Sequence, residues 1–146
     1  MRHVIALLVV LVAGCASTPQ ASVERDREAK QFANSPAAST LYIYRPDSVQ
    51  DDTVLWIDGR LIGATLPRTY FRVNLDPGRH IITGMAGDNG KISFETRPGI
   101  VYFLALTPLS GQSHFQQVSA ESAREALTNC CSLLENWAPG QRPLLR

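Results

Sequence analysis

The sequence has little net charge and few side chains of the kinds that bind metals or act as nucleophiles. Its 146 residues include 14 Lys and Arg against 13 Asp and Glu, for a formal net charge of +1, and only 3 cysteines and 3 histidines. A nucleic-acid binder needs clustered basic residues that release counterions from phosphates, and the basic residues here are spread along the chain. We therefore expect no nucleic-acid partner and no polybasic attachment to lipids.

The sequence patterns of common metal and catalytic sites are also missing. The chain has no H-x-H, H-E-x-x-H or C-x-x-C spacing that would bring metal ligands together. The segment 84–93, GMAGDNGKIS, has glycines six residues apart and Ile after its lysine, which fits a hairpin turn better than a phosphate-binding loop. Ser110 and Ser113 lack the flanking glycines of a nucleophile elbow. We expect no metal, no cofactor and no catalysis; an enzyme would need His80 or His114 in a pocket beside a carboxylate or thiol.

Long apolar runs are limited to one, at the start of the chain. Residues 4–13 are all apolar and follow the basic pair Arg2 and His3. Ten such residues make roughly 15 Å of helix, which is too short to span a bilayer. The run therefore predicts a secretory signal peptide, and it ends in the tetrapeptide VAGC at Cys15.

That tetrapeptide resembles the lipobox of bacterial lipoproteins. The resemblance implies that residues 1–14 are removed as a lipoprotein signal peptide, and that Cys15 is then acylated on its sulfur and its new amino group, with chains such as palmitate. Two or more acyl chains anchor a protein stably, at about 0.8 kcal/mol per buried CH₂. Ala16 resembles the residue that permits sorting to the outer membrane. We expect a lipid-anchored protein of the cell envelope, held in the outer membrane through Cys15 and facing the periplasm; the alternative is an ordinary signal with an incidental cysteine.

The segment after the cysteine is small, polar and charged. Residues 15–39 include Pro19 and Pro36. Residues 23–32 could form a short helix, but too few apolar residues recur at helical spacing to bury it. We interpret this segment as a flexible tether. As a coil it would hold the next domain on the order of 25 Å from the bilayer, and fully extended it would reach roughly 80 Å.

Residues 40–118 carry the alternating pattern of β-strands and predict a single domain. Leu41 and Ile43 alternate with Tyr42 and Tyr44 until Pro46 ends the first strand. Further strands are expected on either side of a type I′ turn at Asp58-Gly59, and at 69–75, 79–86, 91–96 and 100–107. Turns that recur every eight to twelve residues are typical of an antiparallel β-sandwich.

Helical spacing occurs only in residues 119–146. The segment 119–137, SAESAREALTNCCSLLENW, offers Ser119 or Ser122 as N-cap, with Glu125 three residues after the second. We expect one C-terminal helix that covers an edge or face of the sheet, followed by a mobile, proline-broken tail.

Four segments in this order carry a family resemblance: LYIYRP, VLWIDGRLIG, TYFRVNLDPGRHIITG and VYFLALTP. They resemble a family of small bacterial lipoproteins built on a domain of unknown function, over roughly residues 39–127. The middle of the chain also resembles PEGA-type surface modules, which have a similar D-G hairpin and P-G-x-H turn. Both resemblances imply an immunoglobulin-like β fold and no catalysis.

The adjacent pair Cys130 and Cys131 is unusual for a protein of the oxidising envelope. An acylated Cys15 cannot pair with either residue, and a disulfide between neighbours closes a strained ring that is disfavoured within a helix. Two readings stay open. Both cysteines are buried or half-buried thiols, or the outward-facing one forms an intermolecular disulfide.

The aromatic residues Tyr42, Tyr44, Trp56, Tyr70 and Tyr102 also allow two readings. They can line a face for a partner or ligand, or they can fill the core and one half-buried face. The leading hypothesis is a non-enzymatic envelope-maintenance or interaction module whose envelope protein partner docks by strand addition. The alternative is a receptor for a small ligand or glycan that uses an aromatic cleft.

Overall fold

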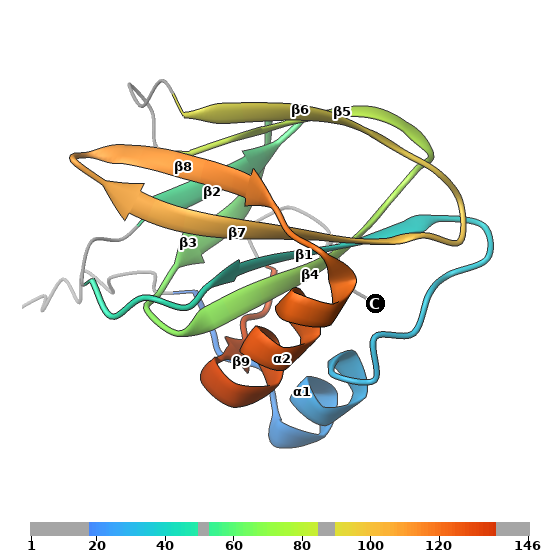
Figure 1. Ribbon diagram of the computed structural model, residues 1–146, viewed down its shortest axis with the longest axis horizontal. Helices are drawn as coiled ribbons and strands as arrows, with labels where there is room; N and C mark the ends of the chain where they lie inside the picture. Colours follow the sequence, from blue (N-terminus) through green and yellow to red (C-terminus); the bar gives the residue numbers. More distant parts are fainter. Residues whose placement is uncertain (1–17, 50–52, 85–89, 137–146) are drawn as a thin grey trace, which may run out of the picture.

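Two β-sheets pack face to face, and two helices cover the outer face of one of them (Figure 1). The computed structural model describes residues 18–49, 53–84 and 90–136. The predicted signal peptide, Cys15 and the tail after residue 137 lie outside the described residues.

The larger sheet has 5 strands in the order β8-β7-β1-β4-β9, and the smaller has 4 in the order β3-β2-β5-β6. In the larger sheet the strands are β1 (Ser39–Arg45), β4 (Thr69–Leu75), β7 (Val101–Leu109), β8 (Gln112–Gln117) and β9 (Ser132–Leu133). In the smaller sheet they are β2 (Thr53–Ile57), β3 (Arg60–Thr65), β5 (Gly78–Thr83) and β6 (Lys91–Thr96). The prediction of a mainly β domain with two sheets and a C-terminal helix is confirmed.

The larger sheet is mixed, so the antiparallel pairing that the sequence predicts is found in only part of it. β1 pairs with β4 in the antiparallel sense but with β7 in parallel, and β9 also runs parallel to β4. Parallel neighbours need a long connection. The chain provides it by passing through the smaller sheet between β1 and β7, and through a helix before β9.

Strand alternation distributes the apolar side chains between two cores. Leu41 and Ile43 of β1 lie between the sheets, whereas Tyr42 and Tyr44 belong to a second cluster under the helices. This is the alternation that the sequence predicts. The Asp58-Gly59 hairpin turn is confirmed as well, because both residues have positive φ, at 50° and 76°.

The second core joins the larger sheet to α1 (Val23–Ala29) and α2 (Ala120–Cys130), which lie together on one side of it (Figure 1). Ser119 is the N-cap of α2, as predicted, because its hydroxyl accepts a hydrogen bond from the Ser122 backbone N–H at 3.4 Å. The helix ends at Cys130 instead of continuing to residue 137. Cys131 is extended, with φ −127° and ψ 149°, and leads directly into β9.

The predicted tether is not a free coil, because the chain packs on the sandwich from Thr18 onward. The α1 helix is held mainly by polar contacts. The Tyr42 hydroxyl donates to the Ala29 carbonyl at 2.6 Å, and the Tyr70 hydroxyl donates to the Asp26 carboxylate at 2.9 Å. An analysis of apolar spacing allows a short helix here but misses the polar contacts that attach it to the sheet.

Candidate functional site

The N-terminal segment closes one side of the sandwich. The Thr18 hydroxyl donates to the Ala64 carbonyl and accepts from the Ala64 N–H, both at 2.8 Å, and so occupies the edge of β3. Gly63 makes this approach possible. A Cβ on Gly63 would lie 3.0 Å from the Phe71 ring and 3.2 Å from the Thr18 side chain, and the glycine has φ 154°.

Residues 19–21 close the adjacent end of the larger sheet. The Ala21 N–H donates to the Leu133 carbonyl at 2.9 Å, and the Glu135 N–H donates to the Pro19 carbonyl at 2.7 Å. An antiparallel bridge joins Gln20 to Leu134 between them. The segment therefore acts as a short additional strand beside β9.

The opposite end of the larger sheet is β8, which the sequence analysis did not predict. The β8 strand follows β7 through a two-residue turn in which Ser110 and Gly111 have φ 53° and 73°. The Ser-Gly pair is the sequence signal that could have identified this hairpin.

The backbone of β8 presents N–H and C=O groups at the edge of the larger sheet, on the side away from β7. The Val118 N–H donates to the Phe103 carbonyl at 3.0 Å, and the register places these two residues opposite each other. Antiparallel ladders alternate between hydrogen-bonded and non-hydrogen-bonded pairs. Phe115 and Gln117 therefore occupy non-hydrogen-bonded positions, and their N–H and C=O groups point away from β7.

The side chains of β8 do not protect this edge. Edge strands are usually blunted by charged side chains, proline or bulges. Between Gln112 and Gln117 the strand has none of the four charged residue types and no proline, and its exposed residues are glutamines and His114. By contrast β6, the end strand of the smaller sheet on the same side, exposes Lys91 and Glu95.

The predicted aromatic face does not form, because α1 and α2 cover it. Tyr42, Tyr44 and Tyr70 are 0%, 5% and 1% exposed. Trp56 lies on β2 in the other sheet and is half-buried, and Tyr102 is half-buried against the core between the sheets. Burial raises the pKa of the Tyr42 hydroxyl, and burial together with the Asp26 carboxylate raises the pKa of Tyr70, so both hydroxyls remain neutral donors.

The structure joins Cys130 and Cys131 in a disulfide, so the expectation of two thiols or of an intermolecular bridge is corrected. The bridge can form because α2 ends between the two residues and Cys131 is already extended. Two cationic side chains bind the backbone here. Lys30 Nζ donates to the Cys131 carbonyl at 2.6 Å, and Arg68 Nε donates to the Cys130 carbonyl at 3.3 Å.

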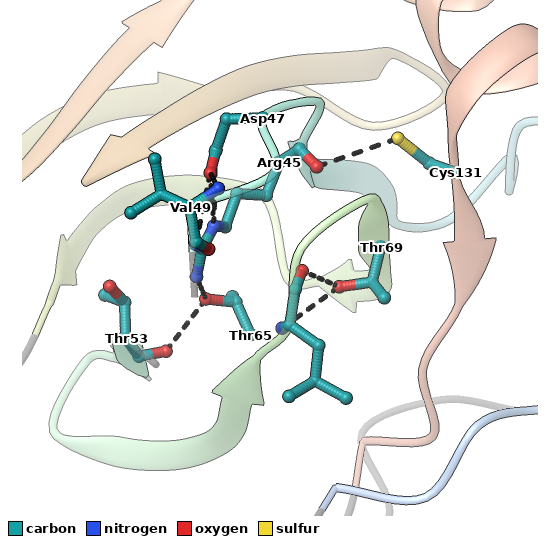
Figure 2. Close-up of polar contacts among 8 residues, drawn as sticks. Arg45, Asp47, Val49, Thr53, Thr65, Thr69 and Cys131 are labelled. Atoms are coloured by element: carbon teal, nitrogen blue, oxygen red, sulfur yellow. Dashed lines mark hydrogen bonds and ion pairs between the residues drawn. The ribbon is translucent and has the colours of Figure 1, made fainter. Parts of the chain in front are cut away.

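A fully buried arginine lies close to the disulfide (Figure 2). The Arg45 guanidinium forms an ion pair with the Asp47 carboxylate at 3.1 Å, donates to the Val49 carbonyl and contacts Thr65 Oγ1 at 3.4 Å. Figure 2 shows the guanidinium turned away from Cys131, whereas the Arg45 carbonyl faces the Cys131 sulfur at 3.8 Å. The cluster fixes the loop after β1, since Asp47 also accepts from the Val49 N–H at 2.9 Å.

His80 is the histidine whose surroundings most resemble a catalytic site. Its Nδ1 lies 2.6 Å from the Asp58 carboxylate, and its Nε2 lies 2.7 Å from the Asp76 carbonyl oxygen. Both partners only accept hydrogen bonds, so the doubly protonated imidazolium satisfies both. Neither ring nitrogen is left to exchange a proton with a substrate.

Electrostatics favour the same protonation state. Burial disfavours a charged His80, but the bonds to Asp58 and Asp76 outweigh it and raise the pKa of His80. Burial also acts on Asp58, but its bonds from His80 and the Ile81 N–H lower the pKa of this carboxyl. The adjoining pocket, of about 160 Å³, is lined by these groups with Ile57, Arg60, Asn74 and Leu75. His80 therefore links the β2–β3 turn, through Asp58, to the β4–β5 turn, through Asp76. We call this pair of contacts the His80 clasp.

Two further findings concern the described ranges as a whole. Within residues 18–49, 53–84 and 90–136, no three His, Cys, Asp or Glu side chains gather as they would around a metal ion. In the same ranges no helix has the length and apolar character needed to cross a bilayer.

Among known proteins, the chain is similar to an "uncharacterized protein" from Haemophilus influenzae. The two chains are 30% identical over 131 residues, which cover 83% of this chain and 77% of the relative. No family model matches the chain, and no solved structure matches it.

Proposed function

We propose that this chain, which belongs to the same family as that Haemophilus influenzae protein, is a lipid-anchored envelope lipoprotein that works as a non-enzymatic interaction module. Its acyl chains are attached to Cys15, it is held in the outer membrane facing the periplasm, and it binds an extended segment of an envelope protein along β8. The two-sheet sandwich agrees with the immunoglobulin-like fold that the sequence resemblance implies.

The position of Thr18 supports a domain that works close to its membrane. Cys15 is three residues before Thr18, so their Cα atoms are separated by at most about 11 Å. The Thr18 side chain is bonded to β3, and residues 19–21 are paired beside β9. An anchor on Cys15 therefore holds the sandwich near the bilayer and turns one fixed side of it toward the lipid.

The two ends of the larger sheet differ, and this difference is the main support for docking at β8. The β9 end is covered by residues 19–21, whereas the β8 end turns the backbone groups of Phe115 and Gln117 outward. A partner strand that pairs with β8 gains main-chain hydrogen bonds and needs no special side chains. Docking at β8 also leaves the anchored side of the domain undisturbed, because β8 and β9 lie at opposite ends of the sheet.

The surroundings of His80 support a role other than catalysis. A general base must be within hydrogen-bond reach of a substrate proton and have a nitrogen free to take it. In His80 both nitrogens are engaged, by Asp58 and by a backbone carbonyl.

Strand docking can be tested with two variants at one position. Gln117→Pro removes an outward N–H from β8, whereas Gln117→Ala keeps it and removes only the side chain. The proposal expects that a tagged full-length chain crosslinked in cells retains its partner band in Gln117→Ala and loses it in Gln117→Pro. Equal bands in both variants, with both folded by circular dichroism, would contradict strand addition at this edge.

The anchor is tested separately by labelling cells with radioactive palmitate. The label is expected in the membrane fraction of the wild type and absent from Cys15→Ala. An unlabelled wild type, or an equally labelled variant, would contradict acylation at Cys15.

A further inference from the structure

The segment that follows the disulfide is the point at which three parts of the protein meet. The Ser132 N–H donates to the Arg68 carbonyl before β4, at 3.1 Å. The Leu133 N–H donates to the Asp26 carboxylate of α1, at 2.8 Å. Residues 133–135 also pair with residues 19–21. Residues 132–135 therefore hold residues 19–21 and Asp26 against the larger sheet, in addition to the bonds that Thr18 and Ala29 make with β3 and β1.

The amino-acid pattern of this segment favours another structure. Leu127, Cys131 and Leu134 recur at the spacing of one helical face, and helical spacing continues through residue 137. The Cys131 N–H still makes the helical bond to the Leu127 carbonyl, at 3.3 Å. For α2 to continue by one more residue, the Ser132 N–H must leave the Arg68 carbonyl. The helix and the β9 pairing thus compete for the same backbone groups.

The disulfide lies at the boundary between these two structures. It links the last residue of α2 to the first extended residue, in a small ring that contains the peptide bond between them. A backbone confined by that ring cannot relax freely into the next helical turn. Cys130 is half-buried whereas Cys131 is 4% exposed, so an external thiol reaches the sulfur of Cys130 first.

We infer that the Cys130–Cys131 disulfide is a site of reversible thiol–disulfide exchange, and that its reduction loosens the pairing of residues 19–21 with residues 133–135. The co-reactant is a protein dithiol of the C-x-x-C class. Its thiolate attacks the Cys130 sulfur and forms a mixed disulfide, and Cys131 leaves as a thiolate that takes up a proton. The second thiol of the partner then attacks the mixed disulfide, which leaves Cys130 as a thiol and the partner as a disulfide. Two electrons pass to this protein, and the reverse reaction restores the bridge.

Reduction favours the competing structure because it removes the ring that holds Cys130 and Cys131 at the helix end. When α2 extends, Leu133 and Leu134 leave Asp26 and Tyr70, and the pairing with residues 19–21 is lost.

The experiment uses the purified full chain in detergent, with and without dithiothreitol. Alkylation followed by peptide mass spectrometry reports the thiols, and hydrogen exchange reports the peptides 18–30 and 131–136, with 78–84 of the smaller sheet as an internal reference. We expect no alkylation at Cys130 or Cys131 without reductant and alkylation of both with it. Exchange in the two test peptides is expected to rise about tenfold or more on reduction, while the reference stays constant.

The double variant Cys130→Ser/Cys131→Ser provides the matched control, with fast exchange in the two test peptides that dithiothreitol does not change. Free thiols in the untreated protein would overturn the exchange site, and unchanged exchange after complete reduction would overturn the loosening of residues 19–21. Neither readout depends on acylation, so a Cys15→Ala chain is expected to respond in the same way. A failed anchor is therefore distinguishable from a failed switch.

Discussion

The His80 clasp predicts that the domain is less stable at high pH than at mildly acidic pH. A protonated imidazole donates to both Asp58 and Asp76, whereas a neutral ring leaves one of these acceptors facing a nitrogen lone pair. Because the pKa of His80 is raised in the folded state, its contribution is fully present below the ordinary value of 6.5 and is lost as the pH rises through the folded value. Asp58 has a lowered pKa, so its contribution is present above its ordinary value of 3.8 and is lost as the pH falls through the folded value.

The size of the effect follows from the two hydrogen bonds. The bond to the Asp76 carbonyl contributes about 1 kcal/mol, typical of one intramolecular hydrogen bond. The bond to Asp58 is charge-assisted, but the Asp58 side chain is 44% exposed, so solvent screening limits it to roughly 0.5–1 kcal/mol. His80→Phe keeps a ring near Phe94 and removes both donors. We therefore expect it to lower the free energy of unfolding at pH 6 by about 1.5–2 kcal/mol.

The assay is urea unfolding of wild type and His80→Phe at several pH values between 5 and 9. The wild type is expected to lose stability above pH 6.5, and the variant is expected to be flatter over the same range. His114→Gln, which changes an exposed histidine of β8, is the control and keeps the wild-type slope. The clasp is refuted if His80→Phe retains the pH slope of the wild type.

Two further substitutions test how the N-terminal segment is held. Tyr42→Phe leaves the Ala29 carbonyl without its 2.6 Å donor and is expected to cost about 1–2 kcal/mol in urea unfolding, with faster exchange in residues 18–30; a loss below about 0.3 kcal/mol would contradict the role assigned to this hydroxyl. Gly63→Ala places a methyl group against the Thr18 side chain and is expected to cost about 1–3 kcal/mol and to detach that residue, as measured by hydrogen exchange. Gly59→Ala, where a Cβ has open space but φ is 76°, is expected to cost about 1 kcal/mol through backbone strain and to leave Thr18 attached; equal detachment of Thr18 in both variants would contradict the close approach at Gly63.

Most of the sandwich was predictable because its strands alternate strongly. The strands at 69–75 and 91–96 match β4 and β6, and the Asp-Gly turn of the β2–β3 hairpin fixed a register that side chains alone leave open. The strand expected at 100–107 continues to Leu109, past Pro108. Proline is tolerated there because Pro108 occupies a non-hydrogen-bonded position opposite β8 and lies beyond the last residue paired with β1.

The elements that were missed lack an apolar period. The β8 strand is polar on both faces except for Phe115, which packs against the core between the sheets. The α1 helix buries only Ala29 and depends on hydroxyl groups from distant strands. Contacts of this kind join residues far apart in the sequence, and no local pattern encodes them.

The candidate sites show the same limitation. Sequence reasoning identified the adjacent cysteines but expected them within one helix, because the helical pattern of residues 119–137 continues past the point at which β9 pairing ends it. The tyrosines of β1 and β4 were recognised as a cluster, but the face that the predicted C-terminal helix covers was left open, and residues 23–29 were expected to belong to a tether. The charged pair of His80 and Asp58 joins two turns through residues that local rules assign only to turn formation.

Site-specific photocrosslinking in living cells tests directly whether the anchored protein binds its partner on β8. A photoreactive residue replaces either Gln116 on β8 or Glu95 on β6 in the full-length protein, with and without Cys15→Ala. We expect one discrete envelope protein to be crosslinked from position 116, with little or no crosslinking from position 95. We expect this crosslink to be lost when Cys15 is changed. Equal crosslinking from both strands, or crosslinking that is unaffected by Cys15→Ala, would contradict an anchored module that docks its partner on β8.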